Sequence, residues 1–420
     1  MSGVRTAAVH WMRFAPLVSL LAAHGLSLAG NAVTLVVIPL YVLQVTGSVF
    51  AAGVAGVFAT VPMIVGGALG GVLVDRLGFR RSAIAADLAS GLTVLAIPVL
   101  AATVGLPFWA LLTLVFLSGV LDTPGNTAKE SLLPDLADSC DVRLTRATGA
   151  ASAISRSAMM VGASVAAVSV VWLGPLNSLL LDAVSFAVSA ALLWSGVPAR
   201  TAASAPEEAT ALGFWREFAD GVRYLAAEPL IRNLVLMIVV TNCFDAAGML
   251  VLKPVYARTV SPDGSLFGIM VACFAFGALA GAGLFGWFGH RLPPRLTLVV
   301  CFILAGPPTY IAMALDLPVP ALLSVFVLAG LSAGSINPLL DAMLYAKIPR
   351  AMRARVLGAL TTGVTAGMPL GSLLGGVAVE KAGLLPTLIV VAAAYALVTL
   401  APTVGRSWRQ LDTKARVVTP

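Results

Sequence analysis

The chain has 420 residues, of which 59% are hydrophobic and 11% charged, and its mean hydropathy is +0.97. A soluble domain carries about 25% charged residues, so the composition excludes a water-soluble globular protein and favours one whose surface faces lipid. The net charge is +7, but the basic residues stand in short segments between apolar stretches, so they indicate membrane orientation rather than nucleic-acid binding.

Apolar stretches recur along the whole chain. A helix that crosses a membrane needs roughly 20 apolar residues, and twelve stretches approach or exceed that length. They are 16–41, 49–74, 82–103, 107–123, 147–172, 176–196, 231–255, 265–288, 296–315, 319–340, 356–378 and 384–404. The first follows Arg5 and Arg13, as in a signal peptide, but it is too long for one, so we interpret it as a span.

Basic residues divide unequally between the two sides of this arrangement. With the N-terminus in the cytoplasm, three of the 26 Lys and Arg lie outside (Lys253, Arg258 and Lys381), Arg156 lies inside the fifth span, and the remaining 22 lie in cytoplasmic segments. Every tryptophan except Trp215 falls at or near a span end, as in an aromatic belt. We therefore predict a multi-pass protein of a bacterial-type inner membrane with both termini in the cytoplasm.

The longest loop, 197–230, separates six spans from six. Trp215, Phe218, Val222 and Leu225 recur there at helical spacing, which predicts an amphipathic helix on the cytoplasmic surface. The predicted organisation is an N-terminal six-helix bundle (1–196), a linker (197–230), a C-terminal six-helix bundle (231–404) and a cytoplasmic tail (405–420). A weak similarity between 116–134 and 327–349 favours two pseudo-symmetric bundles in an all-α fold.

A glycine-rich and basic motif, GGVLVDRLGFRR, follows the second span at residues 70–81. Glycines let helices approach closely, and a carboxylate at a span end can pair with a cation or with a helix N-terminus. The motif resembles the signature of the major facilitator superfamily, although Phe79 stands where a basic residue is usual. The matching residues are Gly71, Asp75, Arg76, Gly78, Arg80 and Arg81.

The resemblance to this superfamily covers the whole chain and implies a transport mechanism. It implies that the two bundles rock about a central cavity lined by the first, fourth, seventh and tenth spans. It also implies that Asp75 gates the cytoplasmic side by contacting the start of the eleventh span, near Arg353 and Arg355. The alternative for Asp75 is a simple loop cap.

Four further stretches resemble the enterobactin-exporter and macrolide-efflux branch of the superfamily. They are VIPLYVLQVTGS, IAADLAS, LLLDAVSF and GVRYLAAEPLIRNL. The glycine-proline motif of antiporters is incomplete in the fifth span, where Gly149 and Gly162 stand without the proline, and a similar run, GVTAGMPLGSLLGG, occurs at 363–376 instead. The branch implies export, whereas the incomplete motif leaves the coupling ion open.

Ionisable and amide side chains inside predicted spans are candidates for proton or substrate contact, because a charge there costs roughly 2.5–3.5 kcal/mol. They are His24, Asp87, Arg156, Asp182 and Asp245, with Asn31, Asn242 and Asn337. We expect Arg156 to reach Asp87 or Asp182. The two groups either form a buried structural ion pair, or one of the two acids is protonatable and lies in the coupling path. Asp245 either contacts substrate or proton or forms hydrogen bonds at an outer gate. His24 either is a hydrogen-bonded packing residue or contacts proton or substrate. Asn31 and Asn337 either form interhelical hydrogen bonds or line the cavity.

Four acids near the predicted cytoplasmic loop, Asp122, Asp135, Asp138 and Asp141, are expected to be solvated. The four cysteines form no CxxC and the three histidines are widely separated, so we predict no metal site, no cofactor beyond a proton gradient, and no enzyme activity.

The sequence thus predicts a secondary active transporter, driven by protons, that exports a small amphipathic molecule such as a drug, siderophore or natural product. Two alternatives are an importer of a small metabolite with the same fold and a membrane sensor or scaffold that transports nothing. The expected partners are a small-molecule substrate and the lipid bilayer, without nucleic acid, and the expected state is a monomer.

Overall fold

The computed structural model describes residues 2–198, 219, 220, 222–348, 353–404 and 408, and leaves undescribed the side chains of some of these, including 2–13 and 66–77. Helices and turns make up this part of the chain, with no β-strand in it. Two compact units divide the chain. The first unit comprises residues 1–41 and 58–208, and the second comprises 42–57 and 209–420.

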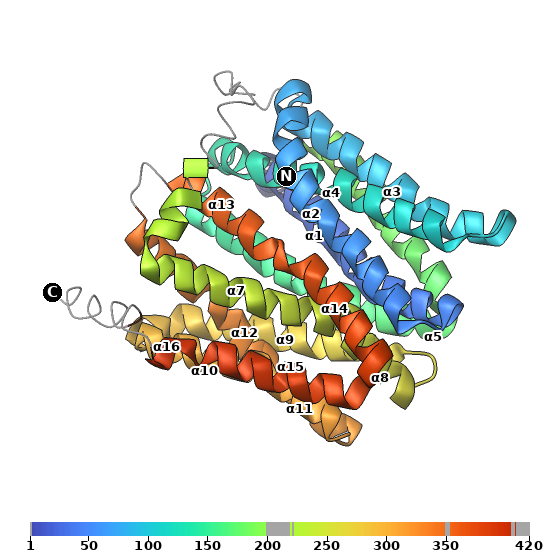
Figure 1. The fold of residues 1–420 in the computed structure, drawn as a ribbon. Coiled ribbons are helices and arrows are strands. Elements are labelled where there is room, and N and C mark those ends of the chain that lie inside the picture. The colour runs from blue at the N-terminus through green and yellow to red at the C-terminus, as the bar shows by residue number, and fades with distance from the viewer. Residues whose placement is uncertain (1, 199–218, 221, 349–352, 405–407, 409–420) are drawn as a thin grey trace. The chain divides into compact units, whose positions relative to one another are not determined.

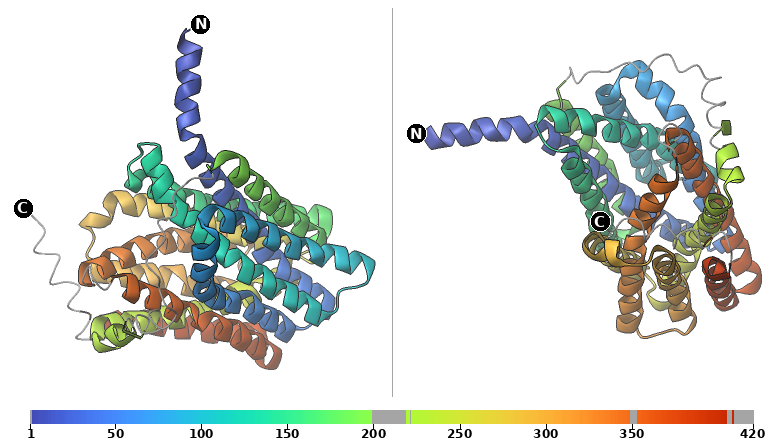
Figure 2. Two further views of the ribbon diagram at one scale, coloured as in Figure 1. Left: turned by 90° about the horizontal axis from the view of Figure 1, so that it is seen from above. Right: turned by 90° about the vertical axis from the view of Figure 1, so that its left-hand side faces the viewer.

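Five long helices begin the chain: α1 (Ser2–Thr46), α2 (Val49–Leu77), α3 (Phe79–Thr103), α4 (Phe108–Ser139) and α5 (Leu144–Gly196). The end of α1 and the start of α2 belong to the second unit. In the first unit, α3 packs along both α4 and α5 (Figure 1). The N-terminal turns of α1 extend beyond these helices in both views of Figure 2.

The second unit continues with shorter, interrupted helices. They are α7 (Pro229–Ala247), the π-helix η1 (Gly248–Leu252), α8 (Lys253–Val260), α9 (Ser265–Phe288), the short 3-10 helix η2 (Gly289–Arg291), α10 (Pro294–Ala305), α11 (Pro307–Ala314), α12 (Val319–Lys347), α13 (Arg353–Thr365), α14 (Gly367–Ala382), α15 (Leu384–Thr399) and α16 (Ala401–Val404). The closest partners are α9 with α12 and α7 with α14.

Most of these helices are long enough to cross a membrane. In the described part of the chain, ten are long and apolar enough to cross a bilayer, and Val49–Val65 of α2 is a shorter apolar helix. One of the ten, Arg146–Gly196, is broken at Gly174 and therefore supplies two crossings. The described helices thus account for the twelve predicted spans.

Single glycines make three of the tight turns between spans. Gly78 (φ +79°) is the one residue between α2 and α3, and Gly383 (φ +86°) is the one residue between α14 and α15. Gly174 (φ +76°) breaks α5, and Pro175 then begins its second half. Side chains strongly disfavour positive φ, whereas glycine does not. Gly78 thus forms the turn inside the motif at 70–81.

In each unit, an arginine in the first turn of one helix donates hydrogen bonds to the C-terminal end of another helix. In the first unit, Arg80 of α3 donates to the carbonyl oxygens of Leu193 and Trp194 in the last turn of α5, at 3.4 and 2.6 Å. In the second, Arg295 of α10 donates to Pro402 and Thr403 at the end of the last span, at 2.8 and 2.7 Å. Cations stabilise helix C-termini. The equivalent positions support an internal repeat.

The fourth span continues well past its predicted end. Residues 124–139 form the second half of α4, although the sequence places them in a cytoplasmic loop. Ala128, Leu132 and Leu136 recur every four residues and are buried, so this half packs a full apolar face. The predicted amphipathic linker helix falls largely outside the described residues, which do not include Trp215 and Phe218.

Candidate functional site

A stripe of polar side chains runs along one face of α1 in the first unit. Its members are His24, Ser27, Asn31 and Thr34, and we call them the α1 polar stripe. Steps of three and four residues place them on the same side of the helix. Each one contacts α4 or α5, so the stripe forms the centre of a buried polar cluster. His24 and Asn31 were predicted from the sequence as candidates, whereas Ser27 and Thr34 were not, although their spacing is visible in the sequence.

The charged centre of the cluster is an ion pair between Asp87 of α3 and Lys129 of α4. The Lys129 Nζ lies 2.7 Å from Asp87 Oδ1, and the two side chains are 1% and 0% exposed. Lys129 also donates to Ser27 Oγ at 2.8 Å, and Ser189 donates to Asp87 Oδ2 at 2.6 Å. A buried ion pair is tolerated when such hydrogen bonds satisfy its remaining polar atoms.

Asp122 of α4 lies further along the stripe. Its Oδ2 accepts hydrogen bonds from Asn31 Nδ2 at 2.9 Å and from Asn126 Nδ2 at 2.8 Å. Its Oδ1 is buried and has no hydrogen-bond partner in the described structure. Asp122 was expected to be solvated, and this prediction is wrong because α4 continues as a helix and turns the residue toward α1. Asp135, Asp138 and Asp141 are exposed, as predicted.

Asp182, in the second half of α5, is the third acid of the cluster and is fully buried. It accepts a short hydrogen bond from Thr34 Oγ1 and a longer one, at 3.4 Å, from Ser185 Oγ. Gly30 makes this approach possible, because a Cβ there would lie 2.3 Å from Asp182 Oδ1 and 2.0 Å from Ser185 Oγ. The sequence identified the acid but not the glycine that admits it.

The cluster therefore contains three carboxyl groups and one lysine. The lysine pairs with Asp87, whereas Asp122 and Asp182 receive hydrogen bonds from neutral amides and hydroxyls. Burying an ionised carboxylate is costly without a cation, so an arrangement with neutral donors suits groups that gain and lose protons.

Arg156 does not pair as the sequence predicts. Asp87 binds Lys129 and Asp182 binds Thr34, and in the described part of the chain Arg156 forms no ion pair. Lys129 was assigned to the cytoplasm because the fourth span was predicted to end too early. His24 is buried and its Nε2 lies 3.5 Å from Ser155 Oγ, while its Nδ1 has no partner in the described structure.

The second unit holds a separate polar group around Asp245 of α7. Its carboxylate accepts a hydrogen bond from the buried Tyr395 at 3.3 Å. The buried Tyr310 donates to the Phe244 carbonyl at 2.9 Å, and it fits there because residue 248 is glycine. The π-helix η1 begins three residues after Asp245, and such irregular turns are frequent at functional sites.

Lys253 follows the π-helix and lies near two aromatic rings. Its Nζ lies 5.7 Å from the ring centroid of Phe274 and 5.6 Å from that of Phe326, which are cation–π distances. It also interacts electrostatically with Asp245. The sequence places Lys253 on the outer side, at the end of the predicted span 231–255, and the helix of crossing length that carries it runs from Pro229 to Val260.

The two remaining asparagines differ in environment. Asn242 of α7 donates to the Val364 carbonyl of α13 at 3.0 Å, so it ties two helices together. Asn337 of α12 has an exposed side chain.

The gating motif is only partly within the described structure. Arg80 binds the end of α5, Arg81 is exposed, and Gly78 forms the turn. The side chains at the other positions of the prediction lie outside the described residues; they are those of Gly71, Asp75, Arg76, Arg353 and Arg355.

Known proteins resemble this chain along most of its length. It is 28% identical over 405 residues to "Multidrug efflux pump Tap" of Mycolicibacterium fortuitum, covering 94% of this chain and 97% of that protein. It is also 28% identical over 389 residues to the pump of the same name from Mycobacterium tuberculosis (strain ATCC 25618 / H37Rv), covering 90% of each. The enterobactin-exporter and macrolide-efflux branch remains a prediction.

Solved transporters share the fold at low identity. The nucleoside transporter NupG superposes with a TM-score of 0.72 at 14% identity, covering 92% of this chain and 97% of its own. A POT family transporter in complex with 5-aminolevulinic acid gives a TM-score of 0.70 at 11% identity, covering 95% and 96%. The family model of the Major Facilitator Superfamily matches residues 20–260 and 235–417. The chain therefore belongs to the major facilitator superfamily.

Proposed function

We propose that this protein exports small amphipathic molecules of several chemical types from the cytoplasm in exchange for protons. Export is supported by similarity to proteins named multidrug efflux pumps over 94% of the chain. Proton exchange is supported by the cluster on the α1 polar stripe, where one lysine accompanies three buried acids.

Asp122 and Asp182 are the proposed proton carriers. Asp87 is already neutralised by Lys129, so the pair serves as a fixed structural centre. A proton on Asp122 or Asp182 would remove a buried negative charge that only neutral groups hold by hydrogen bonds in the described structure. Asp245, with Tyr395 and Lys253, is the proposed contact for polar groups of the substrate in the second unit.

The cytoplasmic gate is proposed to involve Asp75, with Arg353 and Arg355 as partners. We further propose a monomer in a bacterial inner membrane with both termini in the cytoplasm. Reporter fusions at the two ends test this orientation, and an external N-terminus would contradict it. Asp75→Asn is expected to abolish transport without loss of expression, and full transport by this variant would remove Asp75 from the gate.

Transport into everted membrane vesicles tests the central proposal. Vesicles from cells without their own drug pumps should accumulate a fluorescent lipophilic cation when a pH gradient is imposed, and an uncoupler should stop this. Accumulation that ignores the uncoupler would contradict proton exchange, and uptake only by right-side-out vesicles would indicate an importer.

Two substitutions locate the proton site. Asp122→Asn and Asp182→Asn are expected to lose accumulation driven by the pH gradient while still allowing movement down a substrate gradient. Asp135→Asn is the matched control, because Asp135 is an exposed acid on the same helix as Asp122. Normal accumulation by both variants would place the coupling group elsewhere.

A further inference from the structure

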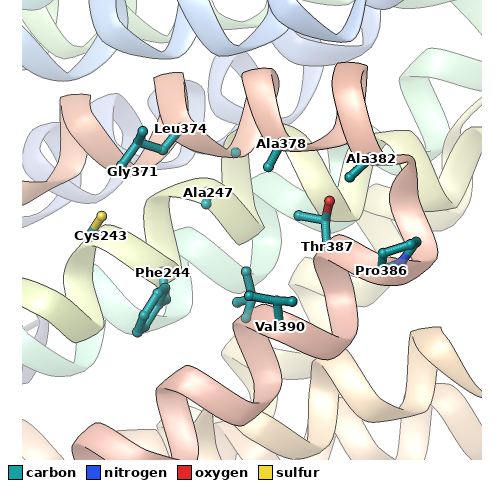
Figure 3. A pocket seen from close by; sticks show the side chains of 12 residues that line it. Cys243, Phe244, Ala247, Gly371, Leu374, Ala378, Ala382, Pro386, Thr387 and Val390 are labelled. Carbon is teal, nitrogen blue, oxygen red and sulfur yellow. The ribbon is translucent and has the colours of Figure 1, made fainter.

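An apolar cleft opens on the second unit, next to the polar group around Asp245. Helices α7, α14 and α15 form it, and its volume is about 230 Å3 (Figure 3). Its walls include Phe244 of α7, Leu374 and Ala378 of α14, and Val390 of α15. Thr387 also lines it, but its hydroxyl donates to the Gly383 carbonyl at 2.7 Å, so the cleft offers few free polar atoms.

The floor of the cleft exists because α7 and α14 touch through small residues. A Cβ at Gly371 would lie 1.9 Å from the Cys243 carbonyl oxygen, and one at Gly375 would lie 2.9 Å from the Ala247 Cβ. Small residues at such positions bring helix backbones together and leave space beside the contact. The third helix, α15, does not fill that space, which leaves the cleft beside the contact between α7 and α14.

The mouth of the cleft opens beside helices that are long and apolar enough to cross a membrane. Leu374 and Val390 at its edge are 60% and 65% exposed, and both stand on helices that cross the bilayer. Apolar cavities bind apolar molecules rather than water, and what surrounds a crossing helix at this depth is acyl chains. The volume is too small for a second helix, whose diameter with side chains is about 10 Å, but it suits a single flexible chain.

A cation stands where the polar end of a lipid would emerge. Lys381 is the basic residue in the last turn of α14, and its side chain is exposed. It follows Ala378 by three residues and Leu374 by seven, so it continues the face of α14 that lines the cleft. In the described structure Lys381 forms no ion pair. Lysines near the ends of membrane-crossing helices extend their ammonium groups to lipid phosphates.

We propose that this cleft is a phospholipid-binding site, with one acyl chain lying between α7, α14 and α15 and the phosphate on Lys381. The charge distribution of the sequence places Lys381 on the outer side, so the lipid comes from the outer leaflet. Phe244 connects the cleft to the polar group behind it, because its ring centroid lies 5.7 Å from that of Tyr395, which donates to Asp245. This proposal goes beyond the proposed export and does not depend on which molecule the protein transports.

Photolabelling of the full chain in liposomes tests the site. The probe is phosphatidylglycerol with a diazirine in one acyl chain, and the labelled peptides are mapped by mass spectrometry. We expect label to concentrate at 243–247 and 374–390, above the level at Leu397 and Leu328, which are 73% and 62% exposed and stand apart from the cleft. Equal labelling of all exposed helix faces would overturn the proposal.

Variants that fill or narrow the cleft test whether the labelling depends on its shape. Ala378→Phe fills the cleft and Leu374→Phe narrows its mouth from an exposed position, so both should lose most of the label. Leu328→Phe, at an exposed position of α12 that does not line the cleft, is the matched control for Leu374→Phe and should keep it. If Ala378→Phe does not fold, Leu374→Phe alone decides, and unchanged labelling in it contradicts the site.

The phosphate contact has a test of its own. Lys381→Gln should reduce phosphatidylglycerol labelling at the cleft to the level given by a diacylglycerol with the same photoreactive chain, which has no phosphate. If the diacylglycerol labels the wild-type cleft as strongly as phosphatidylglycerol does, Lys381 does not hold a phosphate and this part of the proposal is wrong.

Discussion

The ammonium of Lys129 on α4 lies 2.7 Å from the carboxylate of Asp87 on α3, and neither side chain is more than 1% exposed. The pair joins two helices that pack along most of their length, and Ser27 extends the contact to α1. Helices α1, α3 and α4 of the first unit therefore meet at this ion pair. The other two acids of the cluster, Asp122 and Asp182, accept hydrogen bonds from neutral groups instead.

Removing one member of this pair should be far more harmful than removing both. Lys129→Met leaves a buried, uncompensated carboxylate, and breaking a buried pair in this way costs about 3–5 kcal/mol. We expect a large fall in the melting temperature of the purified protein. The double variant Asp87→Asn/Lys129→Met should recover much of that loss.

The exposed pair Arg223–Asp220 provides the control, because Arg223 is 80% exposed. Arg223→Met should change stability by at most about 1 kcal/mol, as exposed ion pairs do. Equal effects of Lys129→Met and Arg223→Met would show that Lys129 is not buried as a charge.

Two glycines on α9 give a matched pair of packing variants. A Cβ at Gly281 would lie 1.9 Å from the Leu331 carbonyl oxygen of α12, whereas one at Gly283 meets nothing within 4 Å. Gly281→Ala should force α9 and α12 apart and lower the melting temperature markedly. Gly283→Ala should be neutral or slightly stabilising, by up to about 1 kcal/mol, because it only reduces backbone freedom in a helix. Similar melting temperatures for the two variants would contradict the close α9–α12 packing.

Lys253 and Asp245 should be energetically coupled although their helix segments are separated by the π-helix. Lys253→Met removes the cation from the rings of Phe274 and Phe326 and also leaves Asp245 without its positive neighbour. A double-mutant cycle with Asp245→Asn should give a coupling energy of about 0.5–3 kcal/mol in thermal or chemical unfolding. Strictly additive effects would show that the two groups do not interact.

Asp263, in the turn between α8 and α9, should make a pH-dependent contribution to stability. Its carboxylate accepts hydrogen bonds from the hydroxyl of Ser261 and from the backbone N–H and hydroxyl of Ser265, at 3.1 and 3.0 Å for the latter two. These bonds, led by that of Ser261, lower its pKa. Because the folded-state pKa lies below the unfolded value, the contribution is complete above the unfolded value and disappears as pH falls through the lowered pKa.

The measurement is the difference in melting temperature between the wild type and Asp263→Asn. This difference should be constant near neutral pH and shrink below about pH 4, where the carboxyl group becomes protonated in both folded and unfolded chains. A difference that grows as the pH falls would show that the turn favours the protonated carboxyl group instead.

Much of this molecule follows from its sequence, because lipid imposes a simple rule on the chain. A helix that crosses a membrane must form its backbone hydrogen bonds internally and present apolar side chains over a fixed length. Each span can therefore be recognised as a stretch of high hydropathy. The tight turn at Gly78 and the twelve crossings follow from that rule and from the freedom of glycine. The family follows from the motif beside that turn.

The partners of the buried polar groups depended on tertiary structure. Hydropathy ended the fourth span at residue 123, which left Asp122 at the edge of a cytoplasmic loop and Lys129 inside that loop. Instead, α4 continues past both residues and buries Lys129 against Asp87. A polar residue in a helix is tolerated when a neighbouring helix supplies its partner, and that partner stands far away in the sequence. Composition and spacing alone determined that the chain crosses the membrane twelve times. Only the packing of α3 against α4, and of α1 against α4 and α5, decided which acid is neutralised by a lysine and which two are held by neutral donors.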